Sequence, residues 1–327
     1  MVSLLITCKN MINRLDVYRE VIDQNGIEFY CPEFDQVMSE EELIELVPQY
    51  DVWVIGDDPC TRKVLEAGIA GNLKFAVKWG IGTDNVDFDA CRDLNFPIPN
   101  TPGMFNEEVS NVALGYLLTL AHNLVWIDQE SRKGVWYKPL GTSLEGKKAA
   151  VIGFGNIGRS LVRKLLSLKM DVWAYDPGFR QENGKILCNY NENLIVDPEL
   201  HKARLDNDLN SVLSNADAVL LVCALTESSH HLINKSTLSL VNDGCFLVNV
   251  ARGKVVKQDD LAEALKSGKV GSAALDVFEE EPLDSTSELY NLKCIFGAHN
   301  SSNTKEGVDR TSFDVLNKII TFFDNKL

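Results

Sequence analysis

The residues best suited to chemistry stand at three places in the second half of the chain. Arg252, Asp276 and His299 each end or directly follow a short apolar run, and the glutamates 279–281 come shortly after Asp276. Oxidation of a hydroxyl group needs a base for its proton, a carboxylate that orients and tunes the base, and a cation that holds an oxyanionic substrate. These side chains supply all three parts.

Each of these residues also has an ordinary structural explanation. Arg252 can be a surface ion-pair partner, His299 a hydrogen-bonded interior histidine, and the acidic run 279–281 a solvated loop. Ligands of open α/β sheets, however, bind at the carboxyl ends of the strands, so residues that follow successive strands converge on one crevice. Their shared placement therefore favours catalysis.

A glycine motif precedes this set along the chain. Residues 153–158 read G-F-G-N-I-G, directly after the apolar run 149–152 and at the start of a helical pattern. In that context the motif predicts a dinucleotide-binding turn, and the alternative is a similar turn that binds no phosphate. Asp176 ends the next predicted strand, where a carboxylate would bind the ribose 2′-OH and repel a 2′-phosphate. The pattern therefore predicts NAD and not NADP.

The elements that carry these residues follow an α/β rhythm. Strand–helix alternation predicts parallel sheets covered on both faces, and six apolar runs after residue 147 match a doubly wound dinucleotide fold. The runs predicted as strands are 3–7, 27–31, 51–56 and 74–80, followed by 148–153, 171–176, 218–223, 245–250, 272–277 and 294–299.

Three segments depart from this rhythm. Residues 97–103 read P-I-P-N-T-P-G, which breaks regular structure and predicts a domain boundary. A long helix follows, because apolar residues recur at helical spacing from 109 to 124. Residues 178–204 are rich in Asn, Asp and Glu and predict an irregular surface excursion with one short strand at 185–188.

Length and composition limit the class of protein. The chain has 327 residues, which favours about two domains. Its net charge of −15 disfavours nucleic acid and anionic membranes as partners. Eight scattered cysteines without a C-x-x-C pair, and a start that does not read as a signal peptide, predict a cytoplasmic protein. The longest uncharged stretch, 109–127, is interrupted by polar residues and predicts a buried helix, not a membrane span.

The chain resembles the D-isomer-specific 2-hydroxyacid dehydrogenase family, which includes phosphoglycerate dehydrogenases and glyoxylate/hydroxypyruvate reductases. The matching stretches are 80–87, 100–103, 153–158, 249–253 and 275–282, and the resemblance covers nearly the whole chain. It implies an α/β fold of two doubly wound parallel-sheet domains. A Rossmann NAD-binding domain (101–299) is expected to be inserted into a flavodoxin-like substrate-binding domain (1–100 and 300–327).

The resemblance also implies catalytic roles. Arg252 is expected to bind the carboxylate and keto oxygen of the substrate, and His299 to act as general acid/base. Glu281 is expected to pair with His299 and raise its pKa. Its neighbours Glu279 and Glu280 are rivals for that role, and only the proline after Glu281 and the family spacing choose between them.

Further residues are implied to bind the cofactor and the substrate. Backbone N–H groups of Asn156 and Ile157 are expected to hold the pyrophosphate, and Asp276 to face the nicotinamide. The expected cofactor-binding residues are Gly153, Gly155, Asn156, Ile157, Gly158, Asp176, Cys223, Val250, Ala251 and Asp276. The expected substrate-binding residues are Lys78, Gly80, Ile81, Gly82 and Arg252, and no metal site is expected.

The implied function is NAD-dependent interconversion of a small D-2-hydroxy acid and its 2-keto acid by hydride transfer. Lys78 suits an anionic tail and favours D-3-phosphoglycerate, although an exposed lysine is more often simply solvated. The alternatives are glyoxylate/hydroxypyruvate reduction and an NAD-sensing, corepressor-like interaction protein on the same fold. Formate enzymes of the family have Gln at the position of Glu281, which counts against formate, whereas phosphite oxidation stays open.

The sequence departs from the family pattern at two places. His299 is followed by Asn300-Ser301-Ser302 in place of the usual small, Gly-containing turn. The strand 218–223 continues as A-L-T without the family's usual His and Pro, which alters the adenine-side wall. The helix 106–122 is expected at a dimer interface, so a homodimer is expected.

Overall fold

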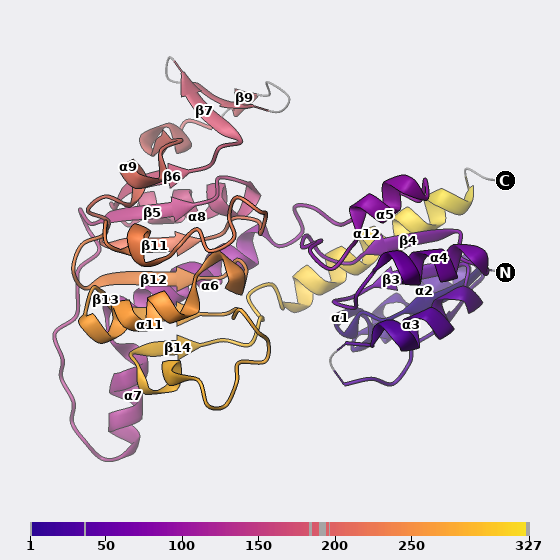
Figure 1. Cartoon of the computed structure of the whole chain (residues 1–327), viewed down its shortest axis with the longest axis horizontal. Helices are drawn as coiled ribbons and strands as arrows, with labels where there is room; N and C mark the ends of the chain where they lie inside the picture. Colours follow the sequence, from indigo (N-terminus) through magenta and orange to yellow (C-terminus); the bar gives the residue numbers. More distant parts are fainter. Residues whose placement is uncertain (1, 36, 183–184, 190–193, 196, 325–327) are drawn as a thin grey trace. The chain divides into compact units, whose positions relative to one another are not determined.

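The computed structural model describes residues 2–35, 37–182, 185–189, 194–195 and 197–324. Two compact units form: unit 1 comprises Met1–Met104 and Ser302–Leu327, and unit 2 comprises Phe105–Ser301 (Figure 1). The sequence-based division has its boundaries at 100/101 and 299/300. The assignment of the first and last segments to the substrate and of the middle segment to NAD stays a prediction.

Unit 1 is built on a parallel sheet of four strands in the order β2-β1-β3-β4. The strands are β1 (Val2–Ile6), β2 (Ile27–Tyr30), β3 (Val52–Ile55) and β4 (Phe75–Lys78). β3 reads V-W-V-I and is fully buried, because a central parallel strand is covered on both faces. The helices are α1 (Lys9–Ile12), α2 (Leu15–Gln24), α3 (Glu40–Leu46), α4 (Arg62–Ala70), α5 (Phe88–Asp93) and α12 (Lys305–Asp324).

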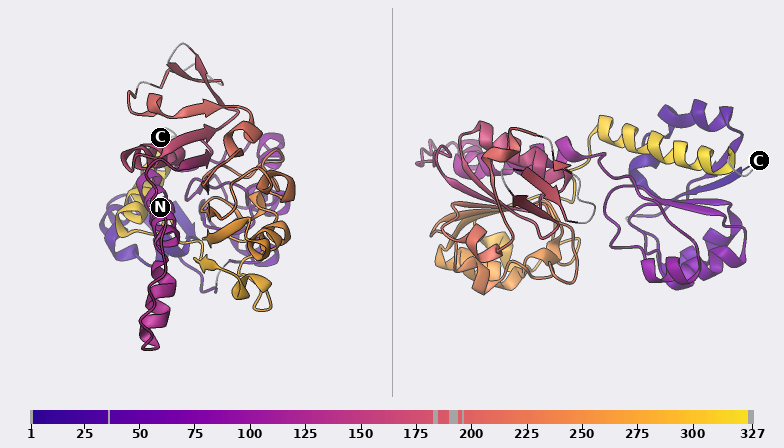
Figure 2. Two further views of the ribbon diagram at one scale, coloured as in Figure 1. Left: turned by 90° about the vertical axis from the view of Figure 1, so that its left-hand side faces the viewer. Right: turned by 90° about the horizontal axis from the view of Figure 1, so that it is seen from above.

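Helix α12 joins the end of the described chain to unit 1. It packs against β4, α1 and α2 on one face of the sheet (Figure 2, right). The Asp309 carboxylate on this helix accepts hydrogen bonds from Arg14 Nε at 2.6 Å and Nη2 at 2.5 Å. It also accepts one from the Tyr18 hydroxyl at 2.7 Å. The Trp79 indole donates to the Ser312 hydroxyl at 3.0 Å. Helix and ion-pair contacts therefore fix the tail within this unit.

Unit 2 contains a parallel sheet of seven strands in the order β10-β6-β5-β11-β12-β13-β14. The strands are β5 (Lys148–Ile152), β6 (Asp171–Tyr175), β10 (Arg204–Asp206), β11 (Ala218–Leu221), β12 (Cys245–Asn249), β13 (Val270–Leu275) and β14 (Cys294–Phe296). Since β6 and β11 lie on opposite sides of β5, the strand order reverses between β5 and β11, which is the ligand-binding position of such sheets. The predicted doubly wound α/β class is confirmed.

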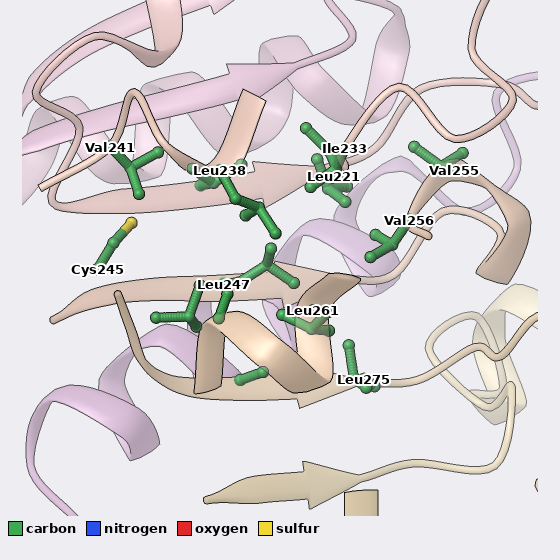
Figure 3. Packing of buried hydrophobic residues seen from close by; sticks show 14 of the residues in the cluster. Leu221, Ile233, Leu238, Val241, Cys245, Leu247, Val255, Val256, Leu261 and Leu275 are labelled. Carbon is green, nitrogen blue, oxygen red and sulfur yellow. The ribbon is translucent and has the colours of Figure 1, made fainter. Parts of the chain in front are cut away.

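Helices cover both faces of this sheet. α6 (Asn106–Ala121) and α8 (Asn156–Ser167) pack on one face, and α9 (Leu209–Leu213), α10 (Lys235–Leu238) and α11 (Gln258–Ser267) on the other (Figure 2, right). Figure 3 shows the core on the second face, where Leu221, Leu247 and Leu275 of the sheet meet Leu238 and Leu261 of the helices. Burial of these apolar side chains holds the strand ends in place.

The excursion at 178–204 is more regular than predicted. Three short strands, β7 (Phe179–Glu182), β8 (Lys185–Cys188) and β9 (Leu194–Ile195), form an antiparallel sheet, of which the sequence predicted only the middle strand. β10 was not predicted either, because it is three residues long and lies at the sheet edge. The remainder of the excursion at 183–184, 190–193 and 196 lies outside the described residues.

The predicted long helix is divided in two. α6 ends at Ala121, Asn123 has a left-handed backbone (φ 56°), and α7 (Leu124–Arg132) follows. α7 and the loop after it extend away from the sheet of unit 2 (Figure 1; Figure 2, left). Within the described part of the chain, no helix combines the length and apolarity that a membrane crossing requires.

Candidate active site

The three predicted catalytic residues belong to unit 2 and follow three adjacent strands. Arg252 follows β12, Glu281 lies in the loop after β13, and His299 follows β14. These strands are parallel neighbours, so their carboxyl ends lie along the same sheet edge. The structure brings the acid/base pair into contact, with His299 Nδ1 2.7 Å from Glu281 Oε2.

Glu281 is distinguished from its two rivals by its contacts. The Phe278 N–H donates to Glu281 Oε1 at 3.0 Å, which orients the carboxylate toward His299. Glu279 instead lies 2.8 Å from His231 Nε2 and accepts from the Gln258 N–H, and Glu280 is exposed. Glu281 is therefore the glutamate of this run that contacts the His299 imidazole.

The charge state of Glu281 follows from opposing effects. Its burial raises the pKa, but the hydrogen bond and charge of His299, the Phe278 N–H and the charge of Arg252 together lower the pKa below its usual range. The carboxylate is therefore ionised near neutral pH. An ionised carboxylate accepts a hydrogen bond from Nδ1–H and favours the protonated imidazole, as a proton donor requires.

Arg252 is held by the turn that carries it. The Asn249 side chain accepts from the Ala251 N–H and donates to the Arg252 carbonyl, each at 3.0 Å. A Cβ on Gly253 would lie 1.8 Å from the Phe278 carbonyl carbon, so only glycine lets this turn pack against the loop that leads to Glu281. This contact brings the Arg252 turn beside the His299–Glu281 pair.

His299 has an unusual backbone. Its φ is 51°, in the left-handed region that costs a non-glycine residue about 1 kcal/mol. The His299 N–H donates to the Asp276 carbonyl at 2.7 Å. Nearly half of the side chain is exposed, so the ring is accessible to a ligand as well as to Glu281.

The glycine motif forms the turn between β5 and α8. Gly153 has φ 107°, and a Cβ on Gly158 would lie 2.0 Å from the Gly153 carbonyl oxygen. A Cβ on Gly155, in contrast, meets nothing within 4 Å. The first and third glycines are thus required by the fold, whereas the second faces open space at the N-terminus of α8. The residues fit a dinucleotide, because a pyrophosphate there would meet the helix N–H groups of Asn156 and Ile157.

Asp176 is fixed beside this turn at the end of β6. One carboxylate oxygen accepts from the Phe154 N–H at 2.7 Å and the other from the Gly178 N–H at 2.8 Å. The excursion adds to this side, since the Phe179 ring packs edge-on against the Phe154 ring. Cys223 borders Gly153, and Val250 and Ala251 follow β12. All these predicted cofactor residues therefore occupy strand ends of one sheet.

Asp276 has partners that the sequence did not indicate. The residue is buried, and its carboxylate accepts from the Asn300 N–H, the Ser301 N–H and hydroxyl, and the Tyr116 hydroxyl. Burial and this neighbouring carboxylate raise the pKa of Tyr116 to about 12, so its hydroxyl stays a donor. Contact of Asp276 with the nicotinamide stays a prediction.

The predicted substrate residues at 78–82 belong to unit 1. The Gly80 N–H already donates to the Thr101 hydroxyl at 2.8 Å, so it is committed within the loop. Across the described residues, the N–H groups of Ile81 and Gly82 have no protein acceptor, and Ile81 is exposed. These two N–H groups are the ones that the loop can offer to an anion.

Lys78 does not fit its predicted role. The side chain is buried, and its Nζ donates to the Gly56 carbonyl at 2.5 Å, the Trp79 carbonyl at 3.1 Å and Asp57 Oδ1 at 3.3 Å. An ammonium group has three donors, and all three are used. The structure therefore argues against contact of Lys78 with an anionic substrate tail.

Several supporting residues were missed by sequence reasoning. Asn249, Gly253 and Ser301 hold the catalytic turns, and Thr101 holds the loop at Gly80. Gly253 lay within a quoted motif and Ser301 within a noted departure, but neither residue type alone indicates a role. Their functions depend on contacts between loops that are distant in sequence.

The three glycines predict separable effects. Gly155→Val should weaken NADH binding at least about 100-fold at unchanged melting temperature, because its side chain occupies only the space next to the helix N–H groups. Gly158→Val should lower the melting temperature, because its side chain collides with Gly153. Fluorescence titration and thermal melts measure both effects.

The matched control is Gly115→Val, since a Cβ on Gly115 in α6 also meets open space. It should leave the NADH affinity unchanged. Tight NADH binding by Gly155→Val would contradict the placement of the pyrophosphate at this turn.

Comparison with known proteins agrees with this geometry. Residues 114–301 match the profile of the D-isomer specific 2-hydroxyacid dehydrogenase, NAD binding domain. Hydroxypyruvate reductase of Thermotoga maritima is 31% identical over 288 residues, which cover 86% of this chain and 88% of the relative. D-3-phosphoglycerate dehydrogenase of Archaeoglobus fulgidus is 31% identical over 297 residues, which cover 89% of this chain but only 53% of the relative, so the chain spans about half of that protein.

A solved structure shows the same architecture over nearly the whole chain. The apo-structure of D-lactate dehydrogenase from Escherichia coli superposes with a TM-score of 0.80 at 25% sequence identity, and the match covers 99% of this chain and 98% of the other. The profile match extends over more than half of the chain and includes the glycine motif, Arg252, Glu281 and His299. The chain therefore belongs to the family of D-isomer specific 2-hydroxyacid dehydrogenases, which are NAD-dependent enzymes.

Proposed function

We propose that this protein reduces a small 2-keto acid to the D-2-hydroxy acid, and catalyses the reverse oxidation, with His299 as the general acid/base. The observation that supports this most directly is the 2.7 Å contact between His299 and an ionised Glu281. It lies at the sheet edge that also carries Arg252 and the glycine motif. A base, an orienting carboxylate and a cation are the parts that this reaction requires.

When bound, the cofactor would supply the hydride for carbon 2 of the keto acid as NADH and would take it back from the hydroxy acid as NAD. Arg252 binds the substrate carboxylate and polarises the keto oxygen. During reduction, His299 donates its Nε2 proton to that oxygen, while Glu281 keeps the ring oriented through Nδ1–H. During oxidation, the neutral imidazole accepts the hydroxyl proton, and Glu281 stabilises the imidazolium that forms.

Cofactor binding is proposed to follow the sequence prediction. Gly153, Gly155 and Gly158 shape the turn, Asn156 and Ile157 supply N–H groups to the pyrophosphate, and Asp176 binds the adenosine ribose. We assign Cys223, Val250, Ala251 and Asp276 to the surroundings of the cofactor. The Asp176 carboxylate would repel a 2′-phosphate, which supports NAD over NADP.

For the substrate we propose a short 2-keto acid without a phosphate, such as glyoxylate or hydroxypyruvate. The N–H groups of Ile81 and Gly82 in unit 1 are proposed to donate hydrogen bonds to an anionic group of the substrate. The Lys78 ammonium group already donates to the Gly56 and Trp79 carbonyls, so it does not support binding of the phosphate of 3-phosphoglycerate. The relatives named hydroxypyruvate reductase and glyoxylate reductase support this choice.

Substitution of the proposed acid/base tests the reaction. His299→Ala should lower kcat for NADH-dependent reduction of glyoxylate or hydroxypyruvate by about a thousandfold, because general acid catalysis is lost, at unchanged NADH affinity. Absorbance of NADH measures turnover. A wild-type preference for 3-phosphohydroxypyruvate would contradict the substrate assignment, and absence of turnover with every 2-keto acid would favour the interaction-protein alternative.

Substitution of the carboxylate tests the pairing. Glu281→Gln should lower kcat for keto-acid reduction by about 100-fold and move the alkaline limb of the pH profile to lower pH. The sign follows because the negative charge of Glu281 favours protonated His299, and a neutral amide does not. Glu280→Gln, one residue away and exposed, should keep the wild-type profile. The assignment fails if Glu280→Gln moves the limb and Glu281→Gln does not.

We further propose a homodimer that uses the arm, defined as residues 124–141. Trp136 and Leu140 in this arm are 85% and 96% exposed, and Leu124, Val135 and Tyr137 are also exposed. Large apolar side chains gathered on a projecting segment mark a protein interface. A second copy of the chain is the partner that the family resemblance implies. The sequence placed this interface at helix 106–122 and did not indicate the arm.

The double variant Trp136→Ser/Leu140→Ser should shift the protein from dimer to monomer in sedimentation velocity, because the two most exposed apolar side chains of the arm are removed. Val37→Ser, at a side chain of unit 1 that is 51% exposed, is the matched control and should stay dimeric. An unchanged dimer in the double variant would exclude the arm as the interface.

The proposed cytoplasmic location is supported by the eight cysteines, which are all free thiols.

A further inference from the structure

The turn that carries His299 is held by one buried carboxylate. Asp276 directly follows β13, and its carbonyl accepts the His299 N–H at 2.7 Å. Its side chain reaches the next two residues of the turn, accepting the Asn300 N–H at 3.2 Å on Oδ1 and the Ser301 N–H at 2.9 Å on Oδ2. Three consecutive residues around the acid/base are therefore fixed to a single aspartate.

The Ser301 hydroxyl adds a side-chain contact to this carboxylate. It donates to Asp276 Oδ2, and both residues are buried. The other donors to the carboxylate are backbone N–H groups and the Tyr116 hydroxyl at 3.4 Å, which is long for such a bond. All four donors are neutral, and each well-placed donor to a buried carboxyl group matters more than it would at the surface.

The approach of the carboxylate to the turn depends on Gly297. A Cβ on Gly297 would lie 2.1 Å from Asp276 Oδ1 and 2.5 Å from the Tyr116 hydroxyl. With glycine there, the carboxylate lies directly under the turn. There the carboxylate accepts the N–H groups that follow His299, while the Asp276 carbonyl accepts the His299 N–H, and the His299 ring meets Glu281 at 2.7 Å.

We propose that Ser301 is a positioning residue for His299, which acts through Asp276 to keep the imidazole aligned with Glu281. This inference rests on the proposed acid/base role of His299, and it assigns a purpose to the point at which the sequence departs from the small, Gly-containing turn of the family. A small residue without a hydroxyl would keep the backbone N–H contact and lose the side-chain donor. The Ser301 hydroxyl thus determines how tightly the turn is closed.

The test compares Ser301→Ala with Ser301→Thr, which keeps the hydroxyl, and with Ser302→Ala, the same change one residue along. Ser301→Ala should lower kcat for hydroxypyruvate reduction about tenfold at unchanged KM for NADH, because a loosened turn misplaces the acid. Ser301→Thr and Ser302→Ala should retain the wild-type kcat. Thermal melts confirm that each variant is folded.

A second readout does not require turnover. NMR titration of the histidine imidazoles, with the His299 signal identified by its absence in His299→Ala, should show the His299 midpoint at lower pH in Ser301→Ala than in wild type. The reason is that the imidazole loses contact with the negative charge of Glu281. Ser301→Thr and Ser302→Ala should leave the midpoint in place.

The outcomes separate this inference from the proposed function. A wild-type midpoint and a wild-type kcat in Ser301→Ala overturn the positioning role and leave the enzyme assignment intact. If wild type reduces no 2-keto acid but the midpoint still moves in Ser301→Ala, the proposed reaction is wrong and the positioning role stands. A loss of kcat equal in Ser301→Ala and Ser302→Ala also overturns the inference, because the hydroxyl on Asp276 then has no special effect.

Discussion

The loops that follow β13 and β14 of unit 2 are held so that the His299 imidazole and the Glu281 carboxylate form a hydrogen bond of 2.7 Å. The two residues belong to different loops, and the parallel pairing of β13 with β14 starts both loops from the same edge. Gly253 permits the close packing that brings the Arg252 turn against one loop, and Asp276 ties down the other. Close packing at Gly253 and Gly297 thus keeps Arg252, Glu281 and His299 together.

Electrostatic interactions determine the charge states of Glu281 and His299. The Glu281 side chain is 35% exposed, and the burial of the rest alone would favour its neutral form, but His299, the Phe278 N–H and Arg252 keep its pKa low. The charged carboxylate in turn favours the protonated ring. The chain as a whole carries a net charge of −15, so the positive character needed for a small anion is local to residues such as Arg252.

Sequence reasoning succeeded where the signal is periodic or local. The strand runs, the glycine turn and the residues after the strands follow from hydrophobic pattern and motif, and the α/β class is confirmed. The contacts of Lys78 could not be predicted, because spacing does not show that a lysine folds back onto the Gly56 and Trp79 carbonyls. The strands β7 and β9, the exposed arm and the Ser301–Asp276 contact depend on tertiary packing, which no local pattern encodes.

In the proposed mechanism, Glu281 acts on catalysis only through His299. A double-mutant cycle of kcat for hydroxypyruvate reduction, with Glu281→Gln, His299→Ala and the double variant, measures this most directly. The double variant should turn over at the rate of His299→Ala, because the carboxylate has no imidazole left to orient. Independent, multiplicative losses in the double variant would contradict it.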